Sequence, residues 1–237
     1  MRILLIFIDG IGLGDDDPAV NPFAAAHTPT LCALANGQRW VRATGAQTSE
    51  RASFIPTDAQ LGVPGRPQSG TSQAAIITGE NVPHLIGRHY GPKPDAVTRD
   101  LLAHDNFFKQ VLAHGKSAGL LNAYPPGLLA SIARGKTLRS SLQHAAYTAG
   151  LPMWDADALY RGDALSEDWT SAGWREHLGF VDAPLYTPMQ AGHKLVELAR
   201  RYDFALCSHW LTDTVGHRGT LAEGVALVET LDGVLAG

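Results

Sequence analysis

Hydroxyl side chains are concentrated in one short stretch of the chain, PQSGTSQAAIITG, at residues 67–79. Ser69, Thr71 and Ser72 precede an apolar run that closes on Thr78-Gly79. The pattern predicts a helix with Ser69 as its N-cap and a polar first turn. A helix N-terminus has unpaired N–H groups and a positive dipole end, which favour a phosphoryl group or an ionised serine oxygen. These residues alone are compatible with a capped helix or with a nucleophile.

Carboxylates and an imidazole occur at two further places in the sequence. Asp9 directly follows the apolar run ILLIFI, and the segment WLTDTVGHRG contains Asp213 and His217 in the spacing D-x-x-x-H. Residues four apart on a helix lie on one face, so an oxygen and an imidazole nitrogen can bind one divalent ion. A capping aspartate beside an exposed histidine gives the same pattern. The spacing by itself therefore leaves the function open.

The elements that must position these residues alternate between strands and helices. Continuous apolar runs predict interior strands at residues 3–8, 118–125 and 204–210. Helical patterns lie at residues 28–35, 105–115 and 189–203. This order predicts an α/β fold with a largely parallel central sheet and helices on both faces. Because ligand sites in such sheets collect at the carboxyl ends of strands, we expect Asp9, Ser69 and Asp213 at one edge of the sheet.

The middle of the chain differs from both ends in residue composition and pattern. Residues 126–187 include a helical pattern and a stretch rich in Asp, Trp, Ala and Gly, without a strand signal. We predict that this segment is an insertion or lid beside a core formed by residues 1–125 and 188–237.

Composition excludes several classes of function. The chain of 237 residues has a net charge of −4, so no excess of Lys and Arg points to nucleic acid. No apolar run approaches the ~18 residues that a membrane-spanning helix requires, and we expect no membrane partner. Cys32 and Cys207 lie in apolar patterns and are not spaced as a disulfide framework or a metal site. The sequence thus predicts a soluble, cytoplasmic protein.

Taken together, the motifs resemble the alkaline phosphatase superfamily. The resemblance lies in Asp9 after the first strand, in Ser69 nine residues before Thr78-Gly79, and in Asp213-x-x-x-His217 after a late strand. The segments LLIFIDGIGLG, NPFAAAHTPTL and TDTVGHRG are similar to the branch of cofactor-independent phosphoglycerate mutases and phosphopentomutases. The resemblance covers both ends of the chain and hardly the middle. It implies an alkaline phosphatase-like fold and phosphoryl transfer through a phosphoserine.

The resemblance also implies roles for single residues. Ser69 would be the nucleophile and would bind one divalent cation together with Asp9, whereas Asp213 and His217 would bind a second cation. Two such ions, zinc or manganese, would lower the pKa of Ser69 and stabilise the leaving oxygen. Thr71 is the fallback nucleophile, because the Gly-Asn-Ser-type motif of the mutases aligns less cleanly with this stretch.

The resemblance implies a phosphomutase or phosphomonoesterase that acts on a small phosphorylated metabolite. A sulfatase-like or phosphodiesterase-like enzyme, or a non-catalytic member that binds a ligand in the cleft, are the alternatives. His89, with Arg88 and Lys93 in the same segment GRHYGPKP, is a candidate for contact with the substrate phosphate, although a surface loop explains these residues equally well. Asn122 and His209 are further candidates for substrate binding. The substrate, the choice of metal and the oligomeric state are not determined by the sequence.

One part of the superfamily pattern has no counterpart in this chain. The superfamily completes its two-metal site with an Asp-His pair and a last His, and the sequence after Thr220 contains neither. We therefore expect a chain that is truncated at its C-terminus. A genuine short form that holds one metal poorly or none is the alternative, and in either case this polypeptide lacks three ligands that the resemblance implies.

Overall fold

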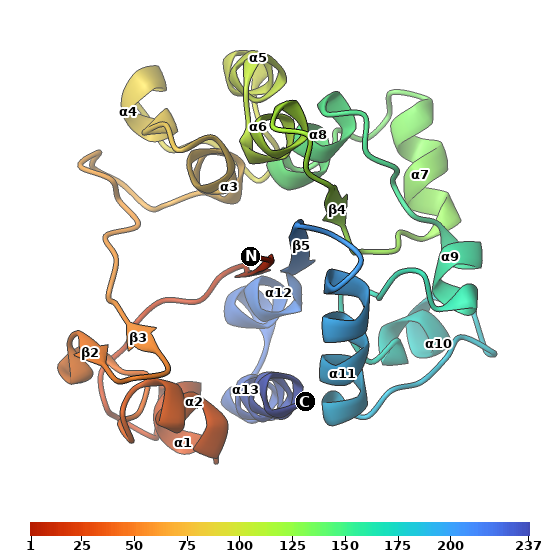
Figure 1. Ribbon diagram of the computed structural model, residues 1–237. Coiled ribbons are helices and arrows are strands. Elements are labelled where there is room, and N and C mark those ends of the chain that lie inside the picture. The colour runs from red at the N-terminus through yellow and green to blue at the C-terminus, as the bar shows by residue number, and fades with distance from the viewer.

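A computed structural model describes all 237 residues, and a sheet of three parallel strands lies at its centre (Figure 1). The strands are β1 (Ile3–Ile8), β4 (Ala118–Leu120) and β5 (Phe204–His209), in the order β1-β5-β4. All three run in the same direction, so their carboxyl ends meet at one edge. The prediction of an α/β fold with a parallel central sheet is confirmed. Of the three segments predicted as interior strands, only β5 lies between two neighbouring strands, whereas β1 and β4 form the edges of the sheet.

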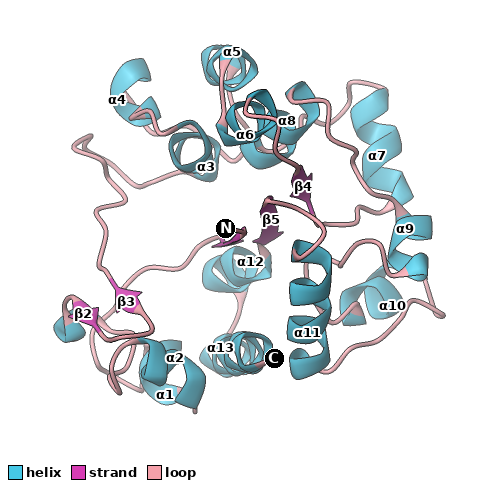
Figure 2. Cartoon of the chain, in the orientation of Figure 1, coloured by secondary structure: helices cyan, strands magenta, loops and turns pink.

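Helices, loops and one small strand pair form the rest of the molecule (Figure 2). In the first half of the chain the helices are α1 (Pro22–Ala25), α2 (Pro29–Leu34), α3 (Ser69–Thr78), α4 (Val82–Ile86), α5 (Ala96–His104) and α6 (Phe107–Ala113). In the second half they are α7 (Pro126–Ala133), α8 (Ser141–Thr148), α9 (Ala156–Arg161), α10 (Ala172–Leu178), α11 (Pro188–Ala199), α12 (Leu211–Arg218) and α13 (Leu221–Ala236). A 3₁₀-helix (Arg42–Thr44) precedes a small antiparallel ribbon of β2 (Gln47–Thr48) and β3 (Ser53–Phe54). No helix combines the length and the apolar character that crossing a membrane would need.

Apolar side chains of β1 and β5 point alternately to the two faces of the sheet. Leu4, Ile6 and Ile8 contact the cluster formed with α2, α11 and α13, which also contains Cys207. Leu5 and Phe7 contact the cluster on the other face, formed with α3, α5, α6 and α8. Side chains of successive strand residues point to opposite faces, so a strand covered on both sides must be apolar at every position. This explains why the run ILLIFI is continuous rather than alternating.

The third strand is shorter than the sequence predicts. The segment predicted at residues 118–125 pairs with β5 only over Ala118–Leu120. Beyond it, Asn122 and Ala123 make isolated bridges to Leu165 and Trp154. The apolar character of the run persists because these residues stay buried, although their backbone partners change.

The segment at residues 126–187 is divided between two environments. Helix α8 packs on α3 and α5 and belongs to the apolar cluster that covers one face of the sheet. Helices α9 and α10 have a small cluster of their own, which includes Leu159 and Trp174. Only the part around α9 and α10 is therefore packed around a separate set of apolar side chains.

Candidate functional site

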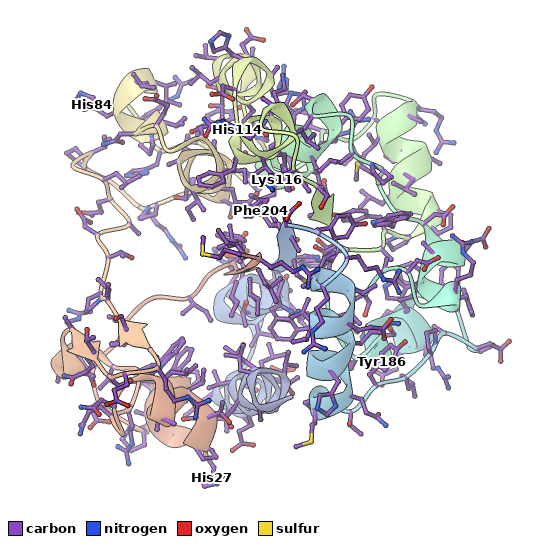
Figure 3. The ribbon with its side chains drawn as sticks, in the orientation of Figure 1. His27, His84, His114, Lys116, Tyr186 and Phe204 are labelled. Carbon is purple, nitrogen blue, oxygen red and sulfur yellow. The ribbon has the colours of Figure 1, made fainter.

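A cavity at the carboxyl edge of the sheet brings several of the predicted residues together. It has a volume of about 300 Å³, and Asp9, Ser69 and Asp213 all line it. The edge that carries the amino ends of the strands has a hollow of similar volume, lined by His114, Lys116 and Phe204, which Figure 3 labels. That second hollow has no serine, threonine or cysteine in its wall. A serine hydroxyl beside carboxylates is thus found at the carboxyl edge, where the sequence predicts these residues to lie.

The Ser69 side chain is directed to Asp9 rather than to its own helix. Ser69 is the first residue of α3, and Gln68 is the N-cap, without a side-chain capping bond. The prediction that Ser69 is the N-cap is therefore wrong by one residue. Its Oγ donates a hydrogen bond to Oδ1 of Asp9 at 3.1 Å. This long-range bond uses the hydroxyl that a cap would have turned toward the backbone.

Three donors hold the Asp9 carboxylate in place. Besides Ser69, Gln73 Nε2 donates to Oδ2 at 3.1 Å and the backbone N–H of Gly10 donates to Oδ1 at 3.0 Å. Burial raises the pKa of Asp9, and the nearby charge of Asp213 acts in the same direction. The three hydrogen bonds lower the pKa but do not cancel the effect of burial. Asp9 and Asp213 are thus close enough for their negative charges to repel.

A glycine allows the two aspartate segments to approach each other. Gly10 has a φ of +71°, and a Cβ at this position would lie 2.4 Å from the Cα of Asp213. Thr212, at the start of α12, donates its hydroxyl to the backbone carbonyl of Asp9 at 2.7 Å. Because any side chain at Gly10 would collide with the backbone of α12, the Asp9-Gly10 pair is required for this contact.

His217 lies one helical turn after Asp213. Its Nε2 is 3.4 Å from Oδ1 of Asp213, and its side chain is exposed. The D-x-x-x-H spacing therefore puts both side chains on one face of α12, as predicted. His217 does not line the cavity. The structure gathers no group of three or more His, Cys, Asp or Glu side chains that could hold a metal ion.

Thr71, the fallback nucleophile, is hydrogen-bonded to neighbouring backbone groups and does not reach the cavity. Thr71 is fully buried, its Oγ1 donates to the carbonyl of Gln68 at 3.2 Å, and it accepts a bond from the N–H of Tyr90. It is not among the residues that line the cavity. Between the two candidate hydroxyls, only that of Ser69 is exposed to a ligand there.

Two of the predicted substrate contacts lie outside the cavity. Arg88 is exposed and forms an ion pair with Asp95 at 3.2 Å. His89 Nε2 is 3.0 Å from the carbonyl oxygen of Val63. Neither side chain lines the cavity. Both residues connect parts of the loop region around α4.

Of the other two candidates, only one lines the cavity. Asn122 is fully buried, donates to the carbonyl of Ser208 at 2.9 Å and accepts from its N–H at 2.8 Å. His209 lines the cavity and is stacked on Trp169, with 4.0 Å between the ring centroids. Its Nδ1 bonds to the carbonyl oxygen of Glu167 at 2.7 Å, so this nitrogen carries the hydrogen. Burial lowers the pKa of His209 to about 4, and the ring is neutral at pH 7.

Lys93 and Glu167 also line the cavity, and of the two only Lys93 stands beside predicted substrate contacts, Arg88 and His89, in the sequence. Burial lowers the pKa of Lys93, whereas the charges of Glu167 and Asp9 raise it. The Lys93 ammonium therefore interacts electrostatically with the carboxylates of Glu167 and Asp9. Glu167 comes from the loop before α10, in the segment LSEDW, which carries no recognisable signal. Packing rather than sequence spacing makes these two residues neighbours of Ser69.

Gln73 also has a free acceptor at this site. Its Nε2 is used by Asp9, but Oε1 is buried and has no hydrogen-bond partner. A buried unpaired amide oxygen is costly, because its bond to water is lost and not replaced. The site therefore has an acceptor available for a ligand next to the Asp9 carboxylate.

No protein-family model, curated protein or solved structure matches this chain.

Proposed function

We propose that this protein transfers phosphoryl groups from small phosphate esters through a phosphoserine at Ser69. The observation that carries the proposal is the hydrogen bond from Ser69 Oγ to Asp9, formed in a cavity at the carboxyl edge of a parallel sheet. It supplies a nucleophile, an acceptor for its proton and space for a substrate. The cavity volume of about 300 Å³ suits a small metabolite.

Ser69 would attack the phosphorus atom while its proton moves to Oδ1 of Asp9. The serine is the first residue of a ten-residue helix, α3, whose N-terminal N–H groups and dipole favour a phosphoryl group bound there. The raised pKa of Asp9 makes this carboxylate a better proton acceptor than an exposed aspartate. The serine would release the phosphoryl group to water in a phosphatase, or to a second hydroxyl of the substrate in a mutase.

Lys93 would offset the negative charge of the phosphoryl group. It lines the same cavity and has no ion pair within 4.0 Å, so its ammonium is available. The segment that carries Lys93 lies against α3 because residue 70 is a glycine. A Cβ on Gly70 would lie 2.5 Å from the carbonyl oxygen of Tyr90 and 2.9 Å from that of Lys93. The Ser69-Gly70 pair thus combines the nucleophile with the close approach of its counter-charge.

The chemistry of the donors at this edge fits divalent cations in part. Asp9 with Ser69, and Asp213 with His217, would hold zinc or manganese, since carboxylate, hydroxyl and imidazole groups are ligands for both. The repulsion between Asp9 and Asp213 and the unpaired Oε1 of Gln73 are features that a cation with its bound water would relieve. A cation held by Asp9 and Ser69 would lower the pKa of Ser69, so that the serine would lose its proton without Asp9 as the acceptor, and it would stabilise negative charge on the phosphoryl oxygens. Each pair still lacks further ligands, so we expect weak binding by this chain.

The test is hydrolysis of nitrophenyl phosphate with added zinc or manganese. We expect Ser69→Ala to abolish turnover and to remove the phosphorylated serine seen by mass spectrometry of the intact protein. Ser72→Ala is the matched control, because Ser72 lies in the same helix, its Oγ has no hydrogen-bond partner, and it does not line the cavity.

Two results would contradict the proposal. One is wild-type protein that shows no turnover with either metal, and the other is Ser69→Ala protein that retains wild-type turnover. Phosphate binding without any turnover would favour the alternative of a non-catalytic protein that holds a ligand in this cavity. Elemental analysis of the purified protein measures the metal content independently of turnover.

A further inference from the structure

A second acidic group in the cavity is not used by the reaction described so far. The Glu167 carboxyl lines the cavity and is bound by two donors from the end of β5. The hydroxyl of Ser208 lies 3.3 Å from Oε1, and the indole N–H of Trp210 donates to Oε2. Ser208 belongs to the central strand β5, and Trp210 directly follows it. The carboxyl is therefore held in a fixed position in the wall.

Ser208 can serve both protonation states of Glu167. Its Oγ lies 3.1 Å from Oδ1 of Asn122 and 3.3 Å from Oε1 of Glu167, but a hydroxyl has only one hydrogen. When Glu167 is ionised, Ser208 donates to it. When Glu167 is protonated, its own O–H donates to Ser208, whose hydrogen then turns to Asn122. The carboxyl can thus gain or lose a proton without leaving a polar group unpaired.

The groups around Glu167 determine the pH at which its carboxyl gains or loses the proton. Burial raises its pKa to about 7, the charge of Asp168 acts in the same direction, and the bonds from Trp210 and Ser208 and the charge of Lys93 lower it. The other titratable groups that face it are the neutral ring of His209, the buried hydroxyl of Tyr124 and the buried thiol of Cys207. None of these three is charged at pH 7, because burial holds the pKa of His209 low and those of Tyr124 and Cys207 high.

We propose that Glu167 is the general acid that protonates the leaving oxygen of the substrate, an inference that rests on the proposed phosphoryl transfer at Ser69. The bond from Ser69 Oγ to phosphorus forms as the bond from phosphorus to the leaving oxygen breaks. That oxygen keeps the electron pair and takes the Glu167 proton, while Asp9 holds the serine proton. In the second step the oxygen of water bonds to phosphorus and loses a proton to Glu167, while the bond from phosphorus to the Ser69 oxygen breaks and that oxygen takes the proton from Asp9. Glu167 is then an acid again and Asp9 a carboxylate.

The role of Glu167 depends on the leaving group. Nitrophenolate is stable enough to leave without a proton, whereas the alkoxide of glycerol is not. General acids contribute roughly 100-fold or more to such steps. We therefore expect Glu167→Gln to lower kcat/KM for glycerol phosphate by about 100-fold and to change that for nitrophenyl phosphate little. Glu176→Gln is the matched control, since Glu176 lies on the exposed surface of α10 away from the cavity.

The pH dependence separates this role from a structural one. An acid must be protonated, so kcat/KM of the wild type for glycerol phosphate should fall as the pH rises through about 7. Glu167→Gln should lack this decrease. Ser208→Ala removes a bond that stabilises ionised Glu167, and we expect the decrease to move to higher pH. This second variant tests the role even if Glu167→Gln fails to fold.

The outcomes distinguish the two proposals. If the wild type turns over neither ester, the phosphoryl transfer is refuted and this role falls with it. If turnover of nitrophenyl phosphate depends on Ser69 but Glu167→Gln lowers both esters equally, or neither, only the role of Glu167 is refuted. A decrease at the same pH in wild type and Ser208→Ala also overturns it. A selective loss on glycerol phosphate together with the shifted decrease supports it.

Discussion

Replacing Gly10 by alanine should destabilise the fold, because Gly10 is where β1 meets the start of α12. Two independent features make the position intolerant of a side chain. Its φ of +71° is in the left-handed region, and a Cβ would lie 2.4 Å from the Cα and 2.8 Å from the Cβ of Asp213. Neither neighbouring atom belongs to a flexible side-chain end, so the backbone of α12 must move. The same movement would draw Asp213 away from Asp9.

The expected magnitude follows from these two features. A left-handed backbone costs an alanine about 1–2 kcal/mol, and the reduced freedom of the unfolded chain offsets about 0.4–1 kcal/mol of this. The net cost of the backbone conformation is therefore about 1 kcal/mol. Forcing an extra methyl group into a packed contact adds about 1–3 kcal/mol. We expect Gly10→Ala to lower the free energy of unfolding by about 2–4 kcal/mol in total.

Two other glycines separate the backbone cost from the packing cost in a urea unfolding experiment. Gly115 has a φ of +66°, and a Cβ there would meet no atom within 4 Å, so Gly115→Ala should carry only the backbone cost. Gly12 has neither a positive φ nor a close neighbour, and Gly12→Ala should be nearly neutral. If Gly10→Ala costs no more than Gly115→Ala at an unchanged m-value, the close packing of Gly10 on α12 is refuted.

Two further predictions concern buried titratable groups. The pKa of His209 is lowered by burial from 6.5 to about 4, so as the pH falls through this window the unfolded chain takes up a proton that the folded chain refuses. The free energy of unfolding should therefore fall by up to about 3 kcal/mol as the pH is lowered. His209→Gln should remove this decrease when unfolding by urea is measured over the same pH range. An unchanged decrease in the variant would contradict the lowered pKa of His209. Burial also raises the pKa of the Cys207 thiol to about 12, whereas Cys32 is only partly buried. A thiol reagent at pH 8 should therefore modify Cys32 in the native protein and Cys207 only after unfolding, and rapid labelling of both in the native state would show that Cys207 is accessible.

The sequence predicts those parts of the site that depend on local pattern. Asp9 stands at the end of an uninterrupted apolar run, which forms a half-buried strand whose side chains contact apolar clusters on both faces of the sheet. The start of α3 is predicted to within one residue of its position, with Ser69 as N1 rather than N-cap. The spacing of Asp213 and His217 predicts a shared helix face, which α12 supplies. Their roles in metal binding and catalysis stay predictions.

Other features of the site could not be predicted, because they depend on contacts between distant segments. Asn122 looks like a polar residue at a strand end, yet the structure buries it and uses its amide to bind Ser208. Arg88 and His89 are polar residues of a loop that packs elsewhere. Lys93 reaches the cavity because its loop can approach Gly70. No spacing in the sequence expresses these contacts.

The sequence by itself determined the α/β order of elements, the continuous apolar strands and the polar groups that end them. These follow from the periodicity of neighbouring side chains, which acts over a few residues. Only the tertiary structure decided that Ser69 turns to Asp9, that Gly10 lets Asp213 approach, and that Glu167 joins the same wall. The physical reason is that burial and charge at a site depend on side chains brought together by packing, whatever their separation along the chain.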